Sequence, residues 1–381
     1  MKKNKILYID YARKEYKVGG GQIYLRNMLS YLNRSKFIPV VYSLSDVSIF
    51  SDVVDCHLYE YSSKRKSVDM IKSDCLSKTF DFHVLKDVCS WFSGAIRQTR
   101  RVLKKENPDI IHLNGLIPLI VTVFSFPKRN CKLVYHVHHT PKKFLAKCIL
   151  NLFSLFTSYD ICISHYIKES VFFLQRRKHV VIYNGTSLPS RLNEYRDREN
   201  TICMLGNFIP WKGHRELVSV IEIEANLLRK YEYKVYFYGH GEQEEQIKKL
   251  VKMKKLDDII KFPGFTRDIE RVLQSSRILL HCSVEPEPFG LVLIEGMANG
   301  NVVIASNLGV AHEIISNNID GYLVNPRDKE AYSKILAYVI QHVDELDDIR
   351  KRAFSKVSKH FNLINNIKEI ESLYDKVLEE R

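Results

Sequence analysis

The sequence lacks both the long apolar runs of membrane proteins and the leader pattern of secreted proteins. No apolar run reaches the roughly 20 residues that a membrane-spanning helix needs. The nearest candidates are Leu116–Phe126, which is too short, and Phe144–Phe156, which is interrupted by Lys147 and Asn151. The segment Met1–Lys5 is basic, but the apolar stretch after it is only as long as a strand, whereas a secretory signal needs a longer one. The sequence therefore predicts a cytoplasmic protein without a signal peptide.

Cysteine occurs, but not in the patterns that bind metal. The eight cysteines include no C-x-x-C pair and no cluster with histidine at zinc spacing. Several of them, such as Cys162 and Cys203, lie inside apolar runs, where a buried and reduced thiol is expected. This distribution fits a reducing compartment.

Excess positive charge is confined to one half of the chain. Residues 1–190 hold 30 Lys and Arg against 14 Asp and Glu, a net charge of +16, whereas the rest of the chain has a net charge of −2. A basic half of this kind can bind nucleic acid or an anionic membrane surface that carries a lipid-linked phosphate. It can also be a solvated face with no partner.

The length of 381 residues, with 45% hydrophobic and 27% charged residues, is typical of two globular domains. Predicted strands and helices alternate, which indicates parallel sheets covered on both faces. In the first half the predicted strands are 5–10, 37–44, 109–113, 132–137, 159–163 and 179–183, and the helices 22–32, 116–126 and 165–175. In the second half the predicted strands are 201–205, 233–238, 259–262, 278–281, 302–306 and 321–324, and the helices 214–229, 242–254, 269–274, 291–299 and 329–341, before two further helical segments.

The polar stretch Ser187–Asn200 is interpreted as the linker between the two halves. The predicted fold class is α/β, with two tandem Rossmann-like domains. The first domain is predicted at 1–190 and the second at 191–360. A C-terminal helix at about 360–381 can pack back on the first domain.

The most specific pattern is the segment 283–300, SVEPEPFGLVLIEGMANG. It follows a predicted strand, so it lies at the carboxyl edge of a parallel sheet, where α/β proteins bind ligands. Phe289 and Gly290 open a helix whose free N–H groups can face an anion. Glu287 and Glu295 can accept hydrogen bonds from two sets of hydroxyls on one ligand. The alternative is that Glu287 only caps the helix and that Glu295 is an ordinary surface glutamate of the helix. Because Glu295 lies among apolar residues, its carboxylate is expected to need a partner.

This segment resembles the E-x7-E motif of the retaining GT-B glycosyltransferases of the large fourth family, the group 1 glycosyl transferases. In that family the first glutamate holds hydroxyls of the donor sugar, the Phe-Gly backbone faces the sugar, and the second glutamate holds the ribose. The resemblance implies a cleft between the two Rossmann-like domains. It also implies donor-binding roles for Glu287, Phe289, Gly290, Leu291 and Glu295.

A second stretch resembles the family's G-R-x…K-G loop, whose Arg and Lys neutralise the donor diphosphate. Here Gly206 and Asn207 follow the first strand of the second half, and Lys212 precedes a glycine. The resemblance gives Lys212 the cationic role, which suits a leaving group that develops negative charge. Asn207 stands where the family usually has Arg, and Arg215 or another basic residue is a candidate substitute.

Further glycines occupy positions that match the family. The turn that contains Gly239 resembles the family's Gly-x-Gly turn near the nucleotide base, although alone it is a plain tight turn. The run Gly19–Gly21 at a predicted helix start resembles the glycine loop that lets donor phosphate and acceptor approach the backbone. This implies donor contacts for Gly20 and Gly21, with a flexible loop as the alternative.

Histidines end two strands of the first half. His112 and Asn114 match the family's D-x-x-H pattern, and His138 matches the strand-end histidine that faces the donor sugar. On an ideal strand His136 and His138 share one side while His139 faces away, so the assignment within the trio stays open. A zinc site is the alternative, but no Cys or carboxylate stands near at ligand spacing.

The chemistry that the resemblance implies is transfer of a sugar from a nucleotide-diphosphate-sugar to a hydroxyl of a glycan or lipid-linked acceptor, with retention. Because the sequence contains no D-x-D, we expect no metal and no other cofactor; Lys212 and helix N-termini then stabilise the leaving group. His138, Lys212 and Glu287 are the predicted catalytic residues. The expected setting is polysaccharide or lipid-linked glycan synthesis, with the basic domain docked peripherally on the inner face of the cell membrane.

Three other functions are alternatives. A nucleotide-sugar epimerase or hydrolase on the same fold would turn over donor without acceptor. A dinucleotide oxidoreductase is disfavoured because no G-x-G-x-x-G follows the first strand. A nucleic-acid-binding protein is disfavoured because no binding motif or basic aromatic stripe appears, so no nucleic-acid partner is expected. Residues 45–105 do not resemble any motif of the family. In the family this region usually determines acceptor specificity.

Overall fold

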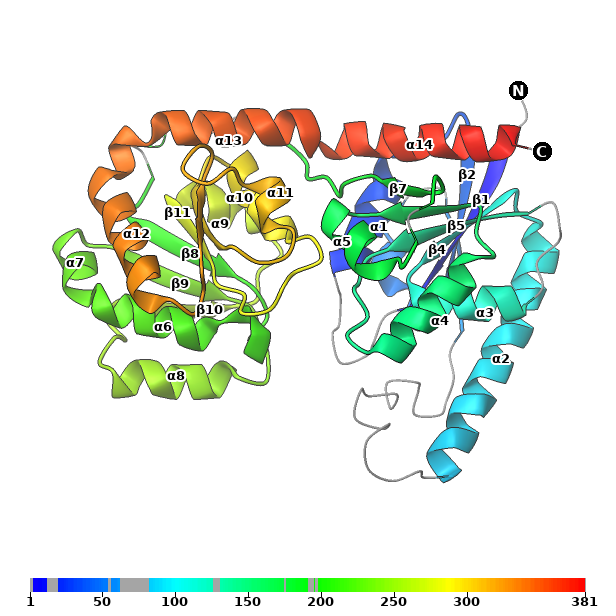
Figure 1. Ribbon diagram of the computed structural model, residues 1–381, viewed down its shortest axis with the longest axis horizontal. Helices are drawn as coiled ribbons and strands as arrows, with labels where there is room; N and C mark the ends of the chain where they lie inside the picture. The colour runs from blue at the N-terminus through cyan, green and yellow to red at the C-terminus, as the bar shows by residue number, and fades with distance from the viewer. Residues whose placement is uncertain are drawn as a thin grey trace. The chain divides into compact units, whose positions relative to one another are not determined.

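The computed structural model describes residues 3–11, 20–53, 56–61, 82–125, 131–174, 176–190, 195 and 198–380. The chain divides into two units (Figure 1): unit 1 comprises Met1–Ile182 with Ile367–Arg381, and unit 2 comprises Tyr183–Asn366. Gly19 and residues 191–194 and 196–197 of the predicted linker lie outside the described residues. Both units are α/β, and the predicted pair of Rossmann-like domains is confirmed.

Unit 1 is built on a seven-stranded parallel sheet in the order β3-β2-β1-β4-β5-β6-β7. The strands are β1 (Asn4–Asp10), β2 (Phe37–Ser43), β3 (His57–Glu60), β4 (Ile110–Asn114), β5 (Lys132–Val137), β6 (Tyr159–Cys162) and β7 (His179–Val181). All except β3 were predicted to within two residues. The central strands are buried on both faces, which explains their continuous apolar runs.

Helices cover both faces of this sheet. They are α1 (Gly20–Tyr31), the short η1 (Ser48–Phe50), α2 (Phe82–Glu106), α3 (Leu116–Phe124), α4 (Phe144–Ser154) and α5 (His165–Val171). The sequence did not predict α2 or α4, although the buried residues Trp91, Ala95, Thr99 and Val102 of α2 recur at helical spacing.

Unit 1 is completed by the end of the chain. The last helix, α14 (Leu363–Glu379), belongs to unit 1 from Ile367 on. The hydroxyl of Tyr374 lies 2.7 Å from Nδ1 of His112, inside the first sheet's core. Lys36 and Asp375 form an ion pair at 2.9 Å on the surface of the same unit.

Unit 2 has a six-stranded parallel sheet in the order β10-β9-β8-β11-β12-β13. The strands are β8 (Thr201–Leu205), β9 (Lys234–Tyr238), β10 (Ile260–Gly264), β11 (Ile278–His281), β12 (Val302–Ser306) and β13 (Tyr322–Val324). The chain reverses its direction across the sheet between β8 and β11, which is where open α/β sheets bind ligands.

The helices of unit 2 follow the predicted alternation, except for one short helix between β12 and β13 that was not predicted and one predicted helix that is divided in two. They are η4 (Pro210–Lys212), α6 (His214–Ile223), α7 (Ala225–Lys230), α8 (Glu244–Met253), α9 (Ile269–Ser275), α10 (Leu291–Ala298), α11 (Ala311–Ile314), α12 (Lys329–His342), η5 (Val343–Glu345) and α13 (Asp347–His360). The single helix predicted at 214–229 was wrong, because Glu224 leaves the helical conformation and separates α6 from α7. Its carboxylate accepts a hydrogen bond from Ser333. None of the described helices is both long and apolar enough to cross a membrane.

Candidate active site

The carboxyl ends of β8, β9 and β11 bring most of the predicted donor residues of unit 2 to one edge of the sheet. Gly206 follows β8, Gly239 follows β9, and Glu287 lies on the loop after β11. Lys212 ends η4, the short helix after β8. Residues from three separate stretches of sequence therefore meet where parallel strands end, as the topology requires.

Glu287 is the centre of a buried polar cluster. Its Oε1 accepts hydrogen bonds from Nζ of Lys212, from the hydroxyl of Ser283, and from Nε2 of His281 at 2.9 Å. The side chain of Ser283 also lies 3.1 Å from Nε2 of His281. Burial opposes ionisation of Glu287, but the Lys212 charge and His281 together hold the pKa of its carboxyl well below the usual range. Glu287 is therefore an anion fixed in position.

His281 and Ser283 were not predicted as site residues. A signal for them exists in the sequence, since His281 ends β11 and Ser283 follows two residues later, and alternate residues of an extended chain point to the same side. They donate to the oxygen that also holds Lys212, so they orient the Glu287 carboxylate.

Lys212 is held between a ring and a carboxylate. Its Nζ lies 4.5 Å from the ring centroid of Trp211 and forms an ion pair with Glu287. The next residue, Gly213, has φ 73°, and a Cβ there would lie 1.8 Å from the carbonyl oxygen of Cys282. Only glycine allows this approach, which brings Lys212 to the end of β11.

Gly239 lets two backbone segments of this edge pack closely, whereas Gly206 makes only ordinary contacts. A Cβ on Gly239, whose φ is 142°, would lie 2.1 Å from the carbonyl oxygen of Gly206. A Cβ on Gly206 would meet only the Lys212 side chain, at 3.7 Å. Asn207 and Arg215 are exposed, and neither joins the Glu287 cluster.

Helix α10 begins directly after this cluster. Gly290 is its N-cap residue with φ 80°, and Leu291 is its first residue. The Phe289 side chain is 3% exposed and packs against the rings of Tyr183 and Phe361, so only its backbone can face a ligand. The free N–H groups at the start of α10 provide hydrogen-bond donors at this edge.

Glu295 lies within α10 and is partly exposed. The sequence predicted that its carboxylate needs a partner, but no described residue forms a hydrogen bond or ion pair with it. Burial instead raises the pKa of Glu295 to about 7. The carboxyl group is thus available to hydroxyl donors of a ligand.

In unit 1 three predicted histidines form a buried cluster. Nε2 of His112 lies 3.1 Å from Nδ1 of His136, and the rings of His136 and His138 are stacked with centroids 4.2 Å apart. His139 is exposed, so the side of the strand that faces the core carries His136 and His138. Burial, and then the neighbouring histidines, hold the pKa of His138 well below its ordinary value, which keeps the ring neutral.

His138 is the histidine nearest to the glycine run. A Cβ on Gly21 would lie 3.1 Å from Cγ of His138, so the start of α1 packs directly on this ring. Neither ring nitrogen of His138 has a hydrogen-bond partner among the described residues. Gly20 is the first residue of α1, which directs its free N–H groups toward the same edge.

Asp10 and Asn114 lie beside this cluster. The Asp10 carboxylate ends β1 and accepts hydrogen bonds from Gln22 at 2.7 Å and from Asn114 at 2.6 Å. Burial raises the pKa of Asp10, although both hydrogen bonds oppose the shift. Within the described ranges, no three His, Cys, Asp or Glu side chains lie close enough to hold a metal ion.

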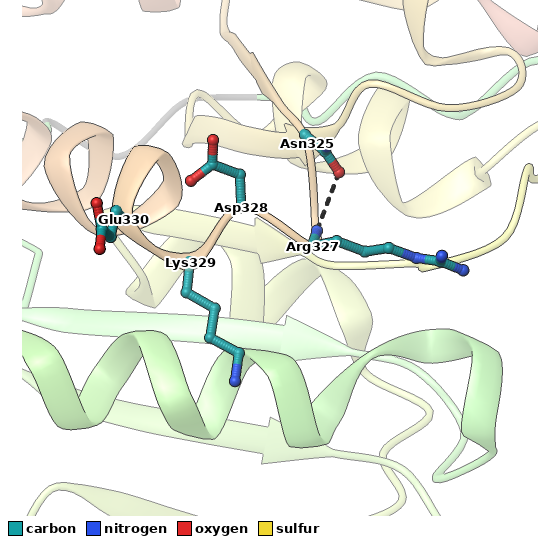
Figure 2. A pocket seen from close by; sticks show the side chains of 5 residues that line it. All are labelled: Asn325, Arg327, Asp328, Lys329 and Glu330. Carbon is teal, nitrogen blue, oxygen red and sulfur yellow. Dashed lines mark hydrogen bonds between the residues drawn. The ribbon is translucent and has the colours of Figure 1, made fainter.

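A hollow of about 440 Å³ lies elsewhere in unit 2, at the start of α12 (Figure 2). It is lined by Asn325, Arg327, Asp328, Lys329 and Glu330. The Asp328 carboxylate caps α12 by accepting from the N–H of Ala331 at 2.9 Å, which gives Asp328 a structural role. None of the predicted site residues lines this hollow.

Comparison with known proteins gives the family. Residues 18–188 match the family Glycosyltransferase Family 4, and residues 191–356 match Glycosyl transferases group 1. The chain is 25% identical over 307 residues to the UDP-Gal:alpha-D-GlcNAc-diphosphoundecaprenol alpha-1,3-galactosyltransferase of Escherichia coli, covering 72% of this chain and 77% of that protein. It is 24% identical over 297 residues to the N-acetyl-alpha-D-glucosaminyl L-malate synthase of Bacillus anthracis, covering 73% and 77%.

Solved structures give the same fold. The crystal structure of Anabaena HepE with UDP and glucose matches with a TM-score of 0.76 and 19% identity, covering 98% of this chain and all of that chain. A glycosyltransferase from Rickettsia africae matches with a TM-score of 0.80 and 22% identity over the full length of both chains. This chain belongs to the GT-B glycosyltransferases, with a Glycosyltransferase Family 4 domain followed by a Glycosyl transferases group 1 domain.

Proposed function

We propose that the protein transfers a sugar from a nucleotide-diphosphate-sugar to a hydroxyl group of a glycan or lipid-linked acceptor, with retention of the anomeric configuration. The observation that carries this proposal is the Lys212–Glu287 pair beside the start of α10. It combines a fixed cation, a fixed carboxylate and free backbone N–H groups at one sheet edge. A sugar diphosphate needs all three, since its phosphates are anionic and its sugar and ribose carry hydroxyls.

Each residue then has a defined task. Glu287 accepts hydrogen bonds from sugar hydroxyls, and Glu295 accepts them from the ribose. Lys212 and the N-terminus of α10 stabilise the negative charge that develops on the departing diphosphate. Gly206 and Gly239 let the donor approach the backbone of unit 2. In unit 1 we assign the same task to Gly20 and Gly21, and we assign contact with the donor sugar to His138.

The reaction proceeds on one face of the sugar. The acceptor hydroxyl oxygen forms a bond to the anomeric carbon on the side from which the diphosphate leaves. The bond between the anomeric carbon and the phosphate oxygen breaks, and that oxygen takes the proton of the acceptor hydroxyl. The protein supplies position and charge rather than a nucleophile, and we assign leaving-group stabilisation to Lys212 without a metal.

The setting we propose is assembly of a polysaccharide or lipid-linked glycan at a membrane. The Escherichia coli relative acts, by its name, on a diphosphoundecaprenol-linked sugar. Another relative is the amylovoran biosynthesis glycosyltransferase AmsK of Erwinia amylovora, 30% identical over 152 residues. The net charge of +16 on residues 1–190 supports docking of this half on an anionic surface.

A thermal-shift panel tests the donor site. UDP, GDP, ADP and their common sugar conjugates are added to the wild type and to Glu295→Ala. UDP is the first to examine, since the Anabaena HepE structure contains it. Stabilisation by one nucleotide class that is lost in Glu295→Ala is expected, and the absence of any shift contradicts the proposal.

A turnover assay separates transfer from the epimerase or hydrolase alternative. The preferred donor is incubated with and without a lipid-linked or glycan acceptor, and the anomeric configuration of the product is read by NMR. Acceptor-dependent turnover with a retained anomer is expected. Donor consumption at the same rate without acceptor supports the alternative.

A further inference from the structure

Helix α4 turns large apolar side chains to solvent. Phe144 is 74% exposed, Leu145 58% and Leu152 57%, and just beyond the helix Leu155 is 52% and Phe156 59% exposed. Single exposed apolar side chains are normal on protein surfaces, but a group of neighbours marks an interaction site. This is the apolar run 144–156 that is too short and too interrupted to span a membrane.

Adjacent elements extend this surface. Phe124 at the end of α3 is 48% exposed, and its ring centroid lies 5.7 Å from that of Phe153 on α4. Phe173 after α5 is 49% exposed, and its ring lies 5.7 Å from that of Phe144. The exposed apolar residues of α4 and of these adjacent segments are here named the α4 patch, which consists of Phe124, Phe144, Leu145, Leu152, Leu155, Phe156, Phe173 and Leu174.

Hydrogen bonds connect the elements that carry the α4 patch. Asn151 joins α4 to the segment after α5, since its Nδ2 donates to Val171 O at 2.9 Å and its Oδ1 accepts from Phe173 N at 3.1 Å. A hollow of about 230 Å³ lies between these elements, with Leu152 and Leu155 in its lining. The exposed side chains are therefore carried by backbone segments that are bonded to each other.

Positive charge surrounds the patch. Between residues 141 and 178 the chain has seven Lys and Arg and only two acidic residues, of which Asp160 is fully buried. Lys147 places its Nζ 5.2 Å from the ring centroid of Phe173, within the patch. The exposed basic residues at the two margins are Lys142 and Lys143 before α4 and Arg176 and Arg177 after Leu174.

We propose that the α4 patch docks on an anionic lipid bilayer, with its apolar side chains among the lipid headgroups and its basic margin on the lipid phosphates. This inference rests on the proposed function, in which the acceptor is lipid-linked. Interfacial membrane helices combine Phe and Leu on one face with Lys and Arg beside them, whereas protein–protein interfaces are depleted in Lys. At about 1.5 Å per residue, α4 is too short to cross a bilayer and suits the headgroup plane.

Docking through α4 fixes where the histidine cluster lies. His138 follows β5 directly, and only residues 139–143 separate it from the first residue of α4. Even a fully extended chain of that length spans no more than roughly 20 Å. The carboxyl edge of β5 is thereby kept within reach of a lipid-linked acceptor.

Vesicle flotation of the full chain tests the proposal. The wild type is mixed with phosphatidylcholine vesicles with and without phosphatidylglycerol. It is compared with the triple variant Phe144→Ser, Leu145→Ser, Phe156→Ser. The matched control is Ile223→Ser, Met253→Ser, Ile319→Ser, which removes equally exposed apolar residues from unit 2. We expect the patch variant to bind anionic vesicles at least about tenfold more weakly, and the control to bind like the wild type.

A second variant, Lys142→Gln with Lys143→Gln, separates the charged margin from the apolar face. It is expected to weaken binding to anionic vesicles and to leave binding to neutral vesicles unchanged. A wild type that does not float with anionic vesicles overturns the proposal. A patch variant that floats like the wild type also overturns it.

Two measurements on the same samples identify the cause of a change. Sedimentation shows whether the patch variant converts a dimer into a monomer with vesicle binding intact, which would make the patch an interface between copies and overturn the proposal. Nucleotide-induced thermal stabilisation reports the donor site in unit 2. Lost flotation with retained nucleotide stabilisation supports bilayer docking, whereas a wild type that floats without responding to nucleotide contradicts the proposed function alone.

Discussion

Lys212 and Glu287, which lie 75 residues apart in the sequence, form an ion pair at the carboxyl edge of the second sheet. The cation predicted to neutralise the donor diphosphate and the carboxylate predicted to hold the donor sugar therefore neutralise each other. A donor brings its own negative charge and competes with Glu287 for Lys212. Donor binding is thus expected to rearrange this pair, while His281 and Ser283 continue to hold the Glu287 carboxylate.

Replacing Glu287 by Gln should lower the transfer rate by about 100-fold or more, because the proposed charged acceptor of sugar hydroxyls is lost from a pre-organised site. The variant keeps the size of the side chain, so the fold should survive. Steady-state kinetics with donor and acceptor measures the effect. Glu285→Gln, on the same loop but outside the Glu287 cluster, serves as the control and should stay near the wild-type rate. Full activity of Glu287→Gln would contradict the proposed role of Glu287 in holding the donor sugar.

Replacing Glu295 by Gln should change how stability depends on pH. The folded pKa of Glu295, about 7, exceeds its value of about 4.5 in an unfolded chain, so the folded state binds the proton more tightly. The contribution of Glu295 to the stability of the wild type is therefore lost as pH rises from about 4.5 to 7, and Glu295→Gln lacks this contribution. Because Glu295 as a whole residue is only partly buried, the difference should be about 1–2 kcal/mol. Urea unfolding at pH 5 and pH 8 measures it, and parallel pH profiles would contradict the shift.

Gly239→Ala should destabilise unit 2 by about 2 kcal/mol or more, because the added Cβ meets the Gly206 carbonyl and the φ of 142° is strained for alanine. Gly206→Ala is the matched variant, since its Cβ meets only the flexible Lys212 side chain. It should change the free energy of unfolding by less than about 1 kcal/mol. Denaturant unfolding compares the two. Equal stability of both variants would show that the backbone approach is dispensable.

His138→Phe should separate stability from catalysis. Neither ring nitrogen has a described hydrogen-bond partner, so a phenyl ring of similar size should change stability by about 1 kcal/mol or less. Transfer should fall by roughly 10- to 100-fold if a ring nitrogen faces the donor sugar. Thermal unfolding and kinetics on the same preparation measure both, with the exposed His139→Ala as control. Unchanged transfer would remove His138 from the site.

The elements around the site were predictable because they are buried on both faces and end in glycine or polar residues. Strands such as Lys132–Val137 and Thr201–Leu205 were predicted at their observed bounds. The segment 283–300 allowed the site to be located from the sequence. It follows the end of a strand and contains a glycine N-cap and then a helix, in the order that the structure shows.

The features that could not be predicted from the sequence depend on contacts with residues far away in the chain. Helix α2 contains Gly94, which disfavours a helix by propensity, yet a Cβ there would lie 2.1 Å from the hydroxyl oxygen of Tyr61. The break at Glu224 coincides with its hydrogen bond to Ser333, more than a hundred residues away. Sequence patterns also could not show that His281 and Ser283 share an oxygen of Glu287.

The return of α14 to unit 1 has a consequence for how the protein is made. Tyr374, which contacts His112 in the core of unit 1, is synthesised only after the whole of unit 2. A ribosome delivers the chain from the N-terminus, so the first unit begun is the last that can be finished. Until residues 367–380 emerge, the nascent first sheet lacks its final helix while the second sheet already has all of its strands.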